Sequence, residues 1–284
     1  MAHKSAGRSA LARHLAVLDA FDPLHPFLTL TEIAAASRLA PSTAHRLVGE
    51  LTREGLLERQ PDRSYRLGVR LWEYASRTPG AVGLREIARP WCEAVHRRVR
   101  QHTQLGILQG TEALYIERLS MPDAVINATL VGGRIPAHAS SAGLVLLAHA
   151  DAGTVDAVCR APMRRYTSET ISGPEQLRRM LTRIRGDGFV VTDGHIHLEA
   201  RAIGVPVRGA GGRVIAALTV VVPNDDTPAQ PIADLLTAAA AGASRDLVRA
   251  SGETGEIAPE TIGLSKRSIE FIAELEEDGA SATR

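Results

Sequence analysis

Residues 29–58 read TLTEIAAASRLAPSTAHRLVGELTREGLLE, and this stretch decides the fold of the amino-terminal part of the chain. Thr29 and Glu32 have the spacing of a capping box, so a short helix is predicted to begin there. Pro41 suits the first position of a second helix, and Gly55 suits a left-handed residue that ends it. Apolar residues recur between them with helical spacing and predict one buried face, at Ala44, Leu47, Val48 and Leu51.

The sequence on either side completes a winged helix-turn-helix. Before the stretch, one face of a first helix carries Leu11, Leu15 and Leu18, and Phe21 closes it. After it, Leu56–Arg59 and Tyr65–Leu67 flank a turn and predict a basic β-hairpin. In such folds the second helix enters the major groove and the hairpin follows the phosphate backbone. The residues predicted to contact DNA are Thr31, Pro41, Ser42, Thr43, His45, Arg46, Arg53, Arg63 and Arg66.

The alternative for this helix is an amphipathic surface element with a solvated charged face. The order of capped helix, turn, glycine stop and basic hairpin favours DNA binding over that alternative. Charge distribution agrees, because residues 38–70 hold seven arginines against four acids although the whole chain has a net charge of only +1. Within the helix, Arg46 has the side chain that can pair with guanine through two hydrogen bonds.

Composition excludes several other classes of protein. At 284 residues with 44% hydrophobic residues, the chain is long enough for two globular domains. Aromatic residues make up only 4%, which argues against a surface that stacks single-stranded bases. No apolar run approaches the ~20 residues that span a bilayer, and no basic-then-apolar leader opens the chain. Cys92 and Cys159 cannot build a disulfide framework or a four-thiolate zinc site, so we expect free thiols in a cytoplasmic protein.

The remainder of the chain predicts a mixed α+β domain. The breaker cluster Arg77–Gly80 marks a junction, and helices and strands follow. Strands are predicted at 103–109, 113–119, 125–130, 189–192, 202–207 and 214–222, and helices at 84–100, 140–150, 175–185 and 232–250. The predicted domains are therefore a winged helix at 9–70, a linker at 71–83, a second domain at 84–250 and a disordered acidic tail at 251–284.

Several ordered segments resemble the IclR family of bacterial transcriptional regulators. They include the residues 30–34, 41–47 and 54–57, which carry the helix-turn-helix, and the run GRIPAHASSAG at 133–143, which looks like the family's Pro-x-His-x-Ser-x-x-Gly segment. Residues 188–193, 201–207 and 212–220 resemble its carboxy-terminal signature. The resemblance covers about residues 9 to 250.

This resemblance implies a GAF-like effector-binding domain after the winged helix. It also implies a repressor or activator that binds palindromic half-sites of operator DNA as a dimer or tetramer, with the interface near Leu84–Arg100. The effector would be a small organic acid or aromatic catabolite. Carried over by motif, the residues that bind it would be Ile135, Ser141, Ala142, Thr192, Ala202, Thr219 and Val221. Asp193 and His195 lie close enough in the sequence to be further candidates.

The chain departs from the family pattern where a polar ligand would be held. Leu144 stands where the family often has lysine, and Val221 stands where it often has a second hydroxyl beyond Thr219. Fewer donors for a carboxylate make a larger or less polar ligand plausible, although backbone amides can supply the same hydrogen bonds.

Two chemical alternatives compete with the regulator. His195 and His197, with Asp193 and Glu199, could form a metal cluster, because alternate residues of a strand share a face. Ser140 or Ser141 could join His138 and Asp193 in a hydrolase triad, but no nucleophile-elbow motif surrounds either serine. We therefore predict a ligand-responsive transcription factor that has no cofactor or metal and is not an enzyme. A metal-binding or hydrolytic domain with an incidental winged helix is the alternative.

Overall fold

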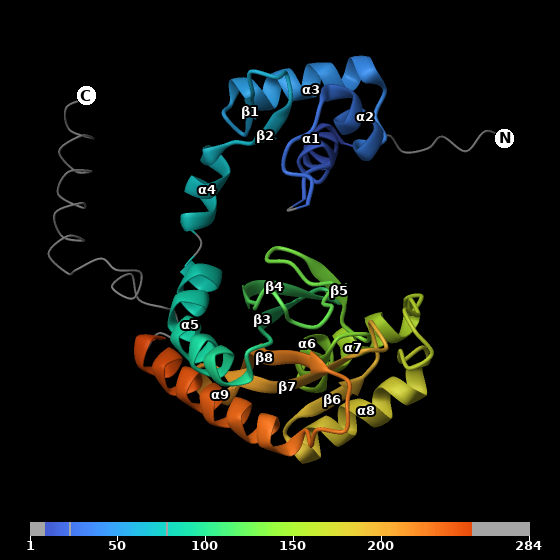
Figure 1. Cartoon of the computed structure of the whole chain (residues 1–284). Coiled ribbons are helices and arrows are strands. Elements are labelled where there is room, and N and C mark those ends of the chain that lie inside the picture. The colour runs from blue at the N-terminus through green and yellow to red at the C-terminus, as the bar shows by residue number, and fades with distance from the viewer. Residues whose placement is uncertain (1–8, 23, 78, 252–284) are drawn as a thin grey trace, which may run out of the picture. The chain divides into compact units, whose positions relative to one another are not determined.

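A computed structural model describes residues 9–22, 24–77 and 79–251 of the chain (Figure 1). The fold divides between Thr78 and Pro79 into two compact units. Residues 252–284 lie outside the described residues, and with them nearly all of the predicted acidic tail. None of the described helices is long and apolar enough to cross a membrane.

The first unit is the predicted winged helix. Its elements are α1 (Ala10–Leu18), α2 (Leu30–Ser37), α3 (Pro41–Arg53), β1 (Leu57–Arg59), β2 (Tyr65–Leu67) and α4 (Val69–Ser76). The capping box forms as predicted, since the Thr29 amide donates to Oε2 of Glu32 at 2.7 Å and the Glu32 amide donates to Thr29 Oγ1. Gly55 has a φ of 71°, the left-handed conformation expected after α3.

The face of α1 was predicted correctly only at its carboxy-terminal end, where Leu18 packs against the core and Phe21 is buried in it. Leu11 and Leu15 are 67% and 48% exposed, whereas Val17 and Phe21 are buried against the residues of α2 and α3. Val17 lies in the last turn of α1, and Phe21 lies just beyond the end of this helix. The core therefore uses Val17 and Leu18 of α1 instead of Leu11 and Leu15.

The predicted linker is also mostly helical. Residues 69–76 form α4, and α5 (Pro79–Val99) begins five residues before the predicted start at 84. Pro79 and Gly80 therefore lie in the first turn of a helix instead of forming a break. A proline there sacrifices no hydrogen bond, because the first amides of a helix have no intrahelical acceptor.

The second unit is built on a six-stranded antiparallel sheet in the order β5-β4-β3-β8-β7-β6. The strands are β3 (His102–Gln109), β4 (Glu112–Leu119), β5 (Arg134–Pro136), β6 (Val190–Asp193), β7 (Ala200–Arg208) and β8 (Val214–Pro223). The helices after α5 are α6 (Ser141–Ala148), α7 (Ala152–Arg160), α8 (Pro174–Asp187) and α9 (Gln230–Ser251), with a 3-10 turn at Ala210–Gly212.

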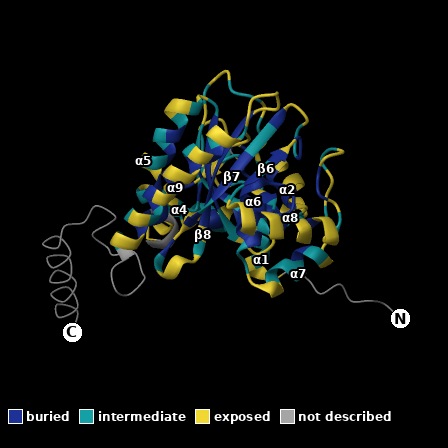
Figure 2. Ribbon diagram, turned by 90° about the horizontal axis from the view of Figure 1, so that it is seen from below, coloured by how far each residue is buried: buried dark blue, intermediate teal, exposed yellow. Residues whose placement is uncertain are grey.

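Helices cover both faces of this sheet. One hydrophobic cluster joins α5 and α9 to one face, through residues such as Cys92, Leu218 and Leu236. The other cluster joins α6 and α8 to the opposite face, through Ala217, Leu144 and Leu181 among others. Most residues of β7 and β8 are consequently buried (Figure 2). The mixed α/β class predicted for this domain is confirmed.

Two elements differ from the sequence prediction. The helix α7 was not predicted, and residues 125–130 form an irregular strap instead of a strand. The side chains of Gln101, just before β3, and of His102, the first residue of β3, supply hydrogen bonds to Val125 in place of a neighbouring strand. The Val125 amide donates to Gln101 Oε1 at 2.8 Å, and His102 Nε2 donates to the Val125 carbonyl at 2.5 Å. The backbone of Val125 is therefore satisfied without strand pairing.

Candidate functional site

The residues predicted to contact DNA lie on α2, α3 and the β1–β2 hairpin. Thr43 is half-buried and the others are exposed: Thr31, Pro41, Ser42, His45, Arg46, Arg53, Arg63 and Arg66. The opposite face of α3 packs Ala44, Leu47, Val48 and Leu51 into the core, as the periodicity predicted. Within this unit, the polar face of α3 is therefore exposed and accessible to a ligand.

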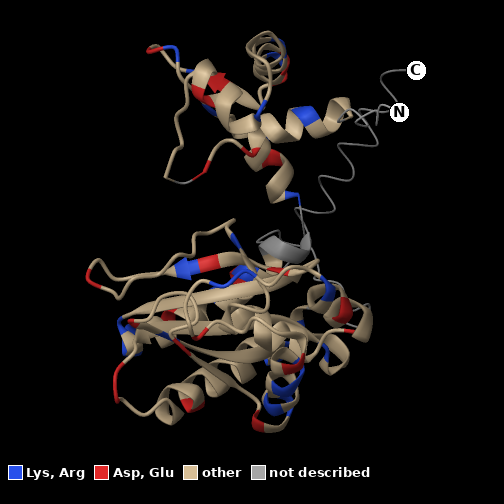
Figure 3. Ribbon diagram, turned by 90° about the vertical axis from the view of Figure 1, so that its right-hand side faces the viewer, with Lys and Arg blue, Asp and Glu red and all other residues tan. Residues whose placement is uncertain are grey.

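Two of these arginines already have acidic partners. Arg46 Nη1 lies 2.5 Å from Glu50 Oε1, one turn along α3, and Arg66 donates through Nε and Nη2 to Glu58 Oε2 at 2.9 and 2.7 Å. Hydrogen bonds from His14 and then Arg46 lower the pKa of Glu50, so this carboxylate is charged at neutral pH. Acidic and basic residues are thus interspersed in the first unit (Figure 3).

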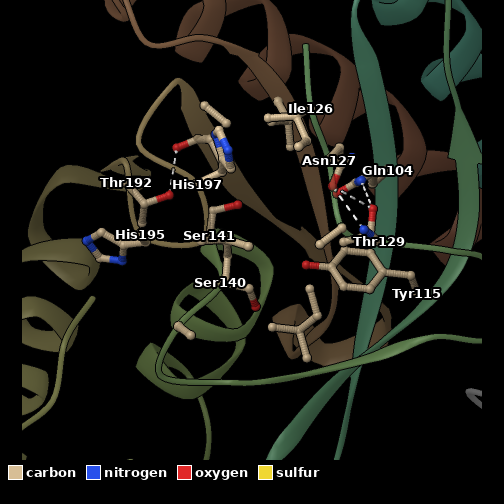
Figure 4. Close-up of a pocket in the computed structure, with 17 residues that line it drawn as sticks. Gln104, Tyr115, Ile126, Asn127, Thr129, Ser140, Ser141, Thr192, His195 and His197 are labelled. Carbon is tan, nitrogen blue, oxygen red and sulfur yellow. Dashed lines mark hydrogen bonds between the residues drawn. The ribbon is translucent and has the colours of Figure 1, made fainter. Parts of the chain in front are cut away.

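The second unit contains a cavity of about 330 Å³ on the α6 side of the sheet (Figure 4). Of the residues predicted to bind the effector, the cavity is lined by Ile135, Ser141, Thr192, His195, Ala202 and Val221. The lining also includes residues that were not predicted for this role, namely Gln104, Tyr115, Ile126, Asn127, Ala128, Thr129, Ala139, Ser140, Ile196, His197 and Ala200. No Lys, Arg, Asp or Glu is among the described residues that line it.

Three predicted residues lie outside this lining. Ala142 is fully buried in α6, close to Gly106 of β3. Asp193 is about half-exposed and pairs with Arg201, whose Nε lies 2.5 Å from Oδ1. Thr219 is fully buried behind Gln104. The predicted face of β8 is correct, because Val221, which lies on the same face of this strand as Thr219, lines the cavity.

One side of the cavity is formed by the amino end of α6. Ser140 caps this helix, since its Oγ accepts a hydrogen bond from the Gly143 amide at 3.1 Å. Gly143 permits the close packing here, because a Cβ at this position would lie 2.3 Å from the Cα of Ala137. The amino end of a helix carries unpaired amides and partial positive charge. This side of the cavity therefore suits an anionic group.

The other side carries a cluster of amide and hydroxyl groups (Figure 4). Gln104 Nε2 donates to Thr129 Oγ1, which itself donates to Asn127 Oδ1 at 3.0 Å. Behind them, Thr219 Oγ1 donates to Gln104 Oε1 at 3.4 Å. These four residues, Thr219, Gln104, Thr129 and Asn127, form a continuous hydrogen-bonded cluster that we call the amide cluster.

Tyr115 and His195 are neutral at physiological pH. Burial raises the pKa of Tyr115 to about 12, opposed by a hydrogen bond with Ser140. Burial lowers the pKa of His195, although nearby Asp193 acts in the opposite direction. His195 Nδ1 is buried with no hydrogen-bond partner in the described structure. The cavity is therefore a largely apolar space lined by uncharged polar groups.

The residues considered for metal binding and hydrolysis have other roles. No group of three or more His, Cys, Asp or Glu that could hold a metal occurs within the described ranges. Asp193 pairs with Arg201, and His197 Nδ1 accepts from the Glu199 amide at 3.3 Å. His138 bonds the Arg164 carbonyl through Nε2 at 3.0 Å instead of contacting a serine. The described residues that were considered for a triad are therefore not arranged as nucleophile, base and orienting acid.

Comparison with known proteins agrees with both units. Residues 10–61 match the model of the IclR helix-turn-helix domain, and residues 78–248 match that of the bacterial transcriptional regulator IclR C-terminal domain. The chain is 32% identical over 213 residues to the HTH-type transcriptional regulator XynR of Escherichia coli, covering 74% of this chain and 84% of that protein. It is 31% identical to the Pca regulon regulatory protein of Pseudomonas putida, covering 75% and 73%.

A solved structure is also similar over most of its length. An IclR homolog from Microbacterium hydrocarbonoxydans, complexed with 4-hydroxybenzoate, is 44% identical, with a TM-score of 0.80, covering 86% of this chain and all of that one. The relatives are regulators and not enzymes. The chain belongs to the IclR family of bacterial transcriptional regulators.

Proposed function

We propose that the effector of this regulator is a small aromatic carboxylic acid that binds in the cavity with its carboxylate at the amino end of α6. The observation that carries the proposal is the combination of an apolar cavity, a helix amino end with Ser140 and Ser141, and a lining without acidic side chains. A carboxylate can be held there by hydroxyls and backbone amides. The complex of the Microbacterium hydrocarbonoxydans homolog with 4-hydroxybenzoate supports this class of ligand.

The predicted effector residues have two roles under this proposal. Ile135, Ser141, Thr192, His195, Ala202 and Val221 would contact the ligand, whereas Ala142, Asp193 and Thr219 would act from behind the lining. Effector binding is assigned to residues 84–250 and DNA binding to residues 9–70. In the latter, Ser42, Thr43 and Arg46 of α3 would face base edges and Arg63 and Arg66 would face the backbone.

Assembly as a dimer or tetramer on palindromic half-sites belongs to the same proposal. One winged helix buries too little surface for a specific site, so two copies are needed. The apolar face of residues 84–100 packs within its own domain, through Leu84, Ala88 and Val95. Exposed apolar residues occur instead on α4, where Val69 is 63% and Trp72 is 70% exposed. We expect these to contribute to contacts between copies in the cytoplasm, where the regulator would meet its operator.

The test is a fluorescence-anisotropy titration of the full chain with the intergenic DNA upstream of its own gene. We expect specific binding that 4-hydroxybenzoate shifts and that EDTA leaves unchanged, since no metal is required. Binding that does not respond to any small aromatic acid would contradict the proposed effector class. Binding that is lost with EDTA would favour the metal-dependent alternative.

A further inference from the structure

The amide cluster has a fixed direction of hydrogen bonding. Thr219 donates to Gln104 Oε1, Gln104 Nε2 donates to Thr129, and Thr129 donates to Asn127 Oδ1 through both Oγ1 and its amide. Each carboxamide oxygen in the cluster therefore already accepts a hydrogen bond. The groups left over are N–H donors, because a carboxamide nitrogen has two hydrogens and no acceptor capacity.

Asn127 ends this series with an unused donor. Its Nδ2 is buried and has no hydrogen-bond partner in the described structure, although the residue lines the cavity. Buried polar groups are nearly always paired, and an unpaired one is costly. Because Asn127 lines the cavity, an acceptor atom supplied by a bound effector would satisfy this donor.

The geometry points to Asn127 as a specificity-determining residue that donates to a second oxygen of the effector, at the end away from the carboxylate. We infer that the cavity selects acids that bear a hydrogen-bond-accepting oxygen there, over isosteric acids that bear a donor. This inference rests on the proposed function, because it presumes a carboxylate at the amino end of α6. Figure 4 places Ser140 and Ser141 on one side of the cavity and Gln104, Asn127 and Thr129 of the amide cluster on the other.

Thr219 is then a positioning residue that acts through Gln104. Its hydroxyl bonds Oε1 of Gln104, which turns Nε2 toward Thr129. Without that hydroxyl the Gln104 carboxamide could rotate by half a turn and offer its oxygen instead. The direction of the hydrogen bonds from Gln104 through Thr129 to Asn127 would then no longer be fixed. Register explains the contact, because Thr219 on β8 is directly paired with Gln104 on β3.

The experiment compares two ligands of the same shape. 4-Hydroxybenzoate has a phenolic oxygen that accepts a hydrogen bond, whereas the amino nitrogen of 4-aminobenzoate is a donor and a poor acceptor. Calorimetric titration of the wild-type full chain should give a Kd for 4-hydroxybenzoate about tenfold lower than that for 4-aminobenzoate, the size expected for one buried hydrogen bond. Asn127→Asp replaces the Nδ2 donor with an acceptor, and we expect the preference to disappear or reverse.

The Thr219 variants test the positioning role. Thr219→Val should reduce the preference between the two ligands, and Thr219→Ser, which keeps the hydroxyl, should restore it. A merely structural role would change both affinities equally and leave their ratio intact. Gln109→Glu is the matched control, since this exposed residue on the same strand β3 adds a negative charge outside the cavity lining. It should leave the ratio of the two affinities unchanged.

The outcomes separate this inference from the proposed function. If the wild type binds both acids with equal affinity, or if Asn127→Asp keeps the wild-type ratio, the inference is wrong while the cavity remains an aromatic-acid site. If the wild type binds neither acid, the proposed effector class is wrong and the inference fails with it. Equal weakening of both ligands by Thr219→Val would remove Thr219 from the positioning role.

Discussion

Tyr115 and Glu117 are two residues apart on β4 but face opposite sides of the sheet. The pairing with β3 shifts between them, because Gly106 pairs with Tyr115 and Leu105 pairs with Glu117, which leaves Ile116 as the extra residue of a β-bulge. Tyr115 therefore lines the cavity, whereas Glu117 lies against α5, with Oε2 3.1 Å from Arg85 Nε. One strand thus connects the cavity wall to the helix that follows the junction between the two units.

Replacing Glu117 should weaken the attachment of α5 to the sheet. The carboxylate is only 4% exposed and also lies 3.8 Å from Arg89, so Glu117→Gln removes the partner of two arginines that are themselves about half-exposed. After allowance for solvent screening we expect the free energy of unfolding to fall by about 1–2 kcal/mol. Urea denaturation followed by circular dichroism measures this change.

The control for this variant is Glu93→Gln. Glu93 also pairs with Arg89, but it is 41% exposed on the outer surface of α5, so its loss should change stability by less than about 0.5 kcal/mol. Equal effects of the two variants would show that the bulge and its buried carboxylate have no special part in holding α5.

Arg46 and Arg66 should differ in what they contribute to operator binding. If Arg46 reads a guanine, Arg46→Ala should cost about 1–3 kcal/mol of operator affinity and relax the preference at one base per half-site. Arg66→Ala should weaken all sequences alike and reduce the salt slope by about one, as expected for a phosphate contact. Anisotropy titrations against operator and random DNA at several salt concentrations separate these outcomes.

Arg183→Ala is the matched control for both arginine variants. It breaks a similar one-turn ion pair, with Asp187 on α8 of the second unit, and should leave DNA binding unchanged. Unchanged binding of operator and random DNA by Arg46→Ala would mean that α3 is not the recognition helix.

Assembly should be visible in the molar mass of the full chain. One chain has a mass of 30.3 kDa, and light scattering at micromolar concentration should give twice or four times this value. Trp72→Glu should shift the population toward the monomer, because it places a charge on the exposed apolar surface of α4. Leu24→Glu, at a residue that is 73% exposed outside α4, should not. A monomeric wild type would contradict the expected assembly.

Acidification should destabilise the second unit through His102. Burial lowers the pKa of His102 below its usual 6.5, with nearby Arg118 and His96 acting in the same direction and the hydrogen bond to Val125 opposing them. The unfolded chain then binds the proton more readily, so the stabilisation is present above about pH 6.5 and is lost as the pH falls below it. Urea unfolding at about pH 7.5 and about pH 5.5 should therefore show a stability loss that is smaller in His102→Gln.

His25→Gln is the comparison for the histidine variant. His25 is exposed in the first unit, with 67% of its side chain accessible, and removing it should leave the loss on acidification as large as in the wild type. A wild type whose second unit is equally stable at both pH values would contradict the assignment to His102, whose Nδ1 accepts from Ser120 and whose Nε2 donates to Val125.

Local chemistry explains which parts of the fold the sequence predicts. The start of α2 follows from the contact between Thr29 and Glu32, and the end of α3 follows from Gly55. Strands β3, β4, β7 and β8 follow from their apolar character. Leu11 and Leu15 mislead, because the periodicity of a short helix does not say which of two apolar stripes meets its neighbours.

The cavity is less predictable because it depends on long-range pairing. Alternation along β8 correctly puts Thr219 and Val221 on one face, but only the register with β3 reveals that Gln104 stands in front of Thr219. Asn127 and Thr129 carry no motif at all. They reach the cavity because Gln101 and His102 hold the strap, and nothing in the local sequence of the strap encodes that contact.

If α3 is the recognition helix, the ion pair between Arg46 and Glu50 means that the Arg46 guanidinium meets DNA with its charge already compensated. To bind a phosphate or a guanine, the Arg46 guanidinium must leave the Glu50 carboxylate, which stays nearby. Contact with DNA of arbitrary sequence would then exchange one ion pair for another, and the Glu50 carboxylate would repel the phosphates. Only a base with two well-placed acceptors would bind the Arg46 guanidinium more favourably than Glu50 does. Under that assignment, Glu50 would favour binding to the operator over binding to DNA of arbitrary sequence.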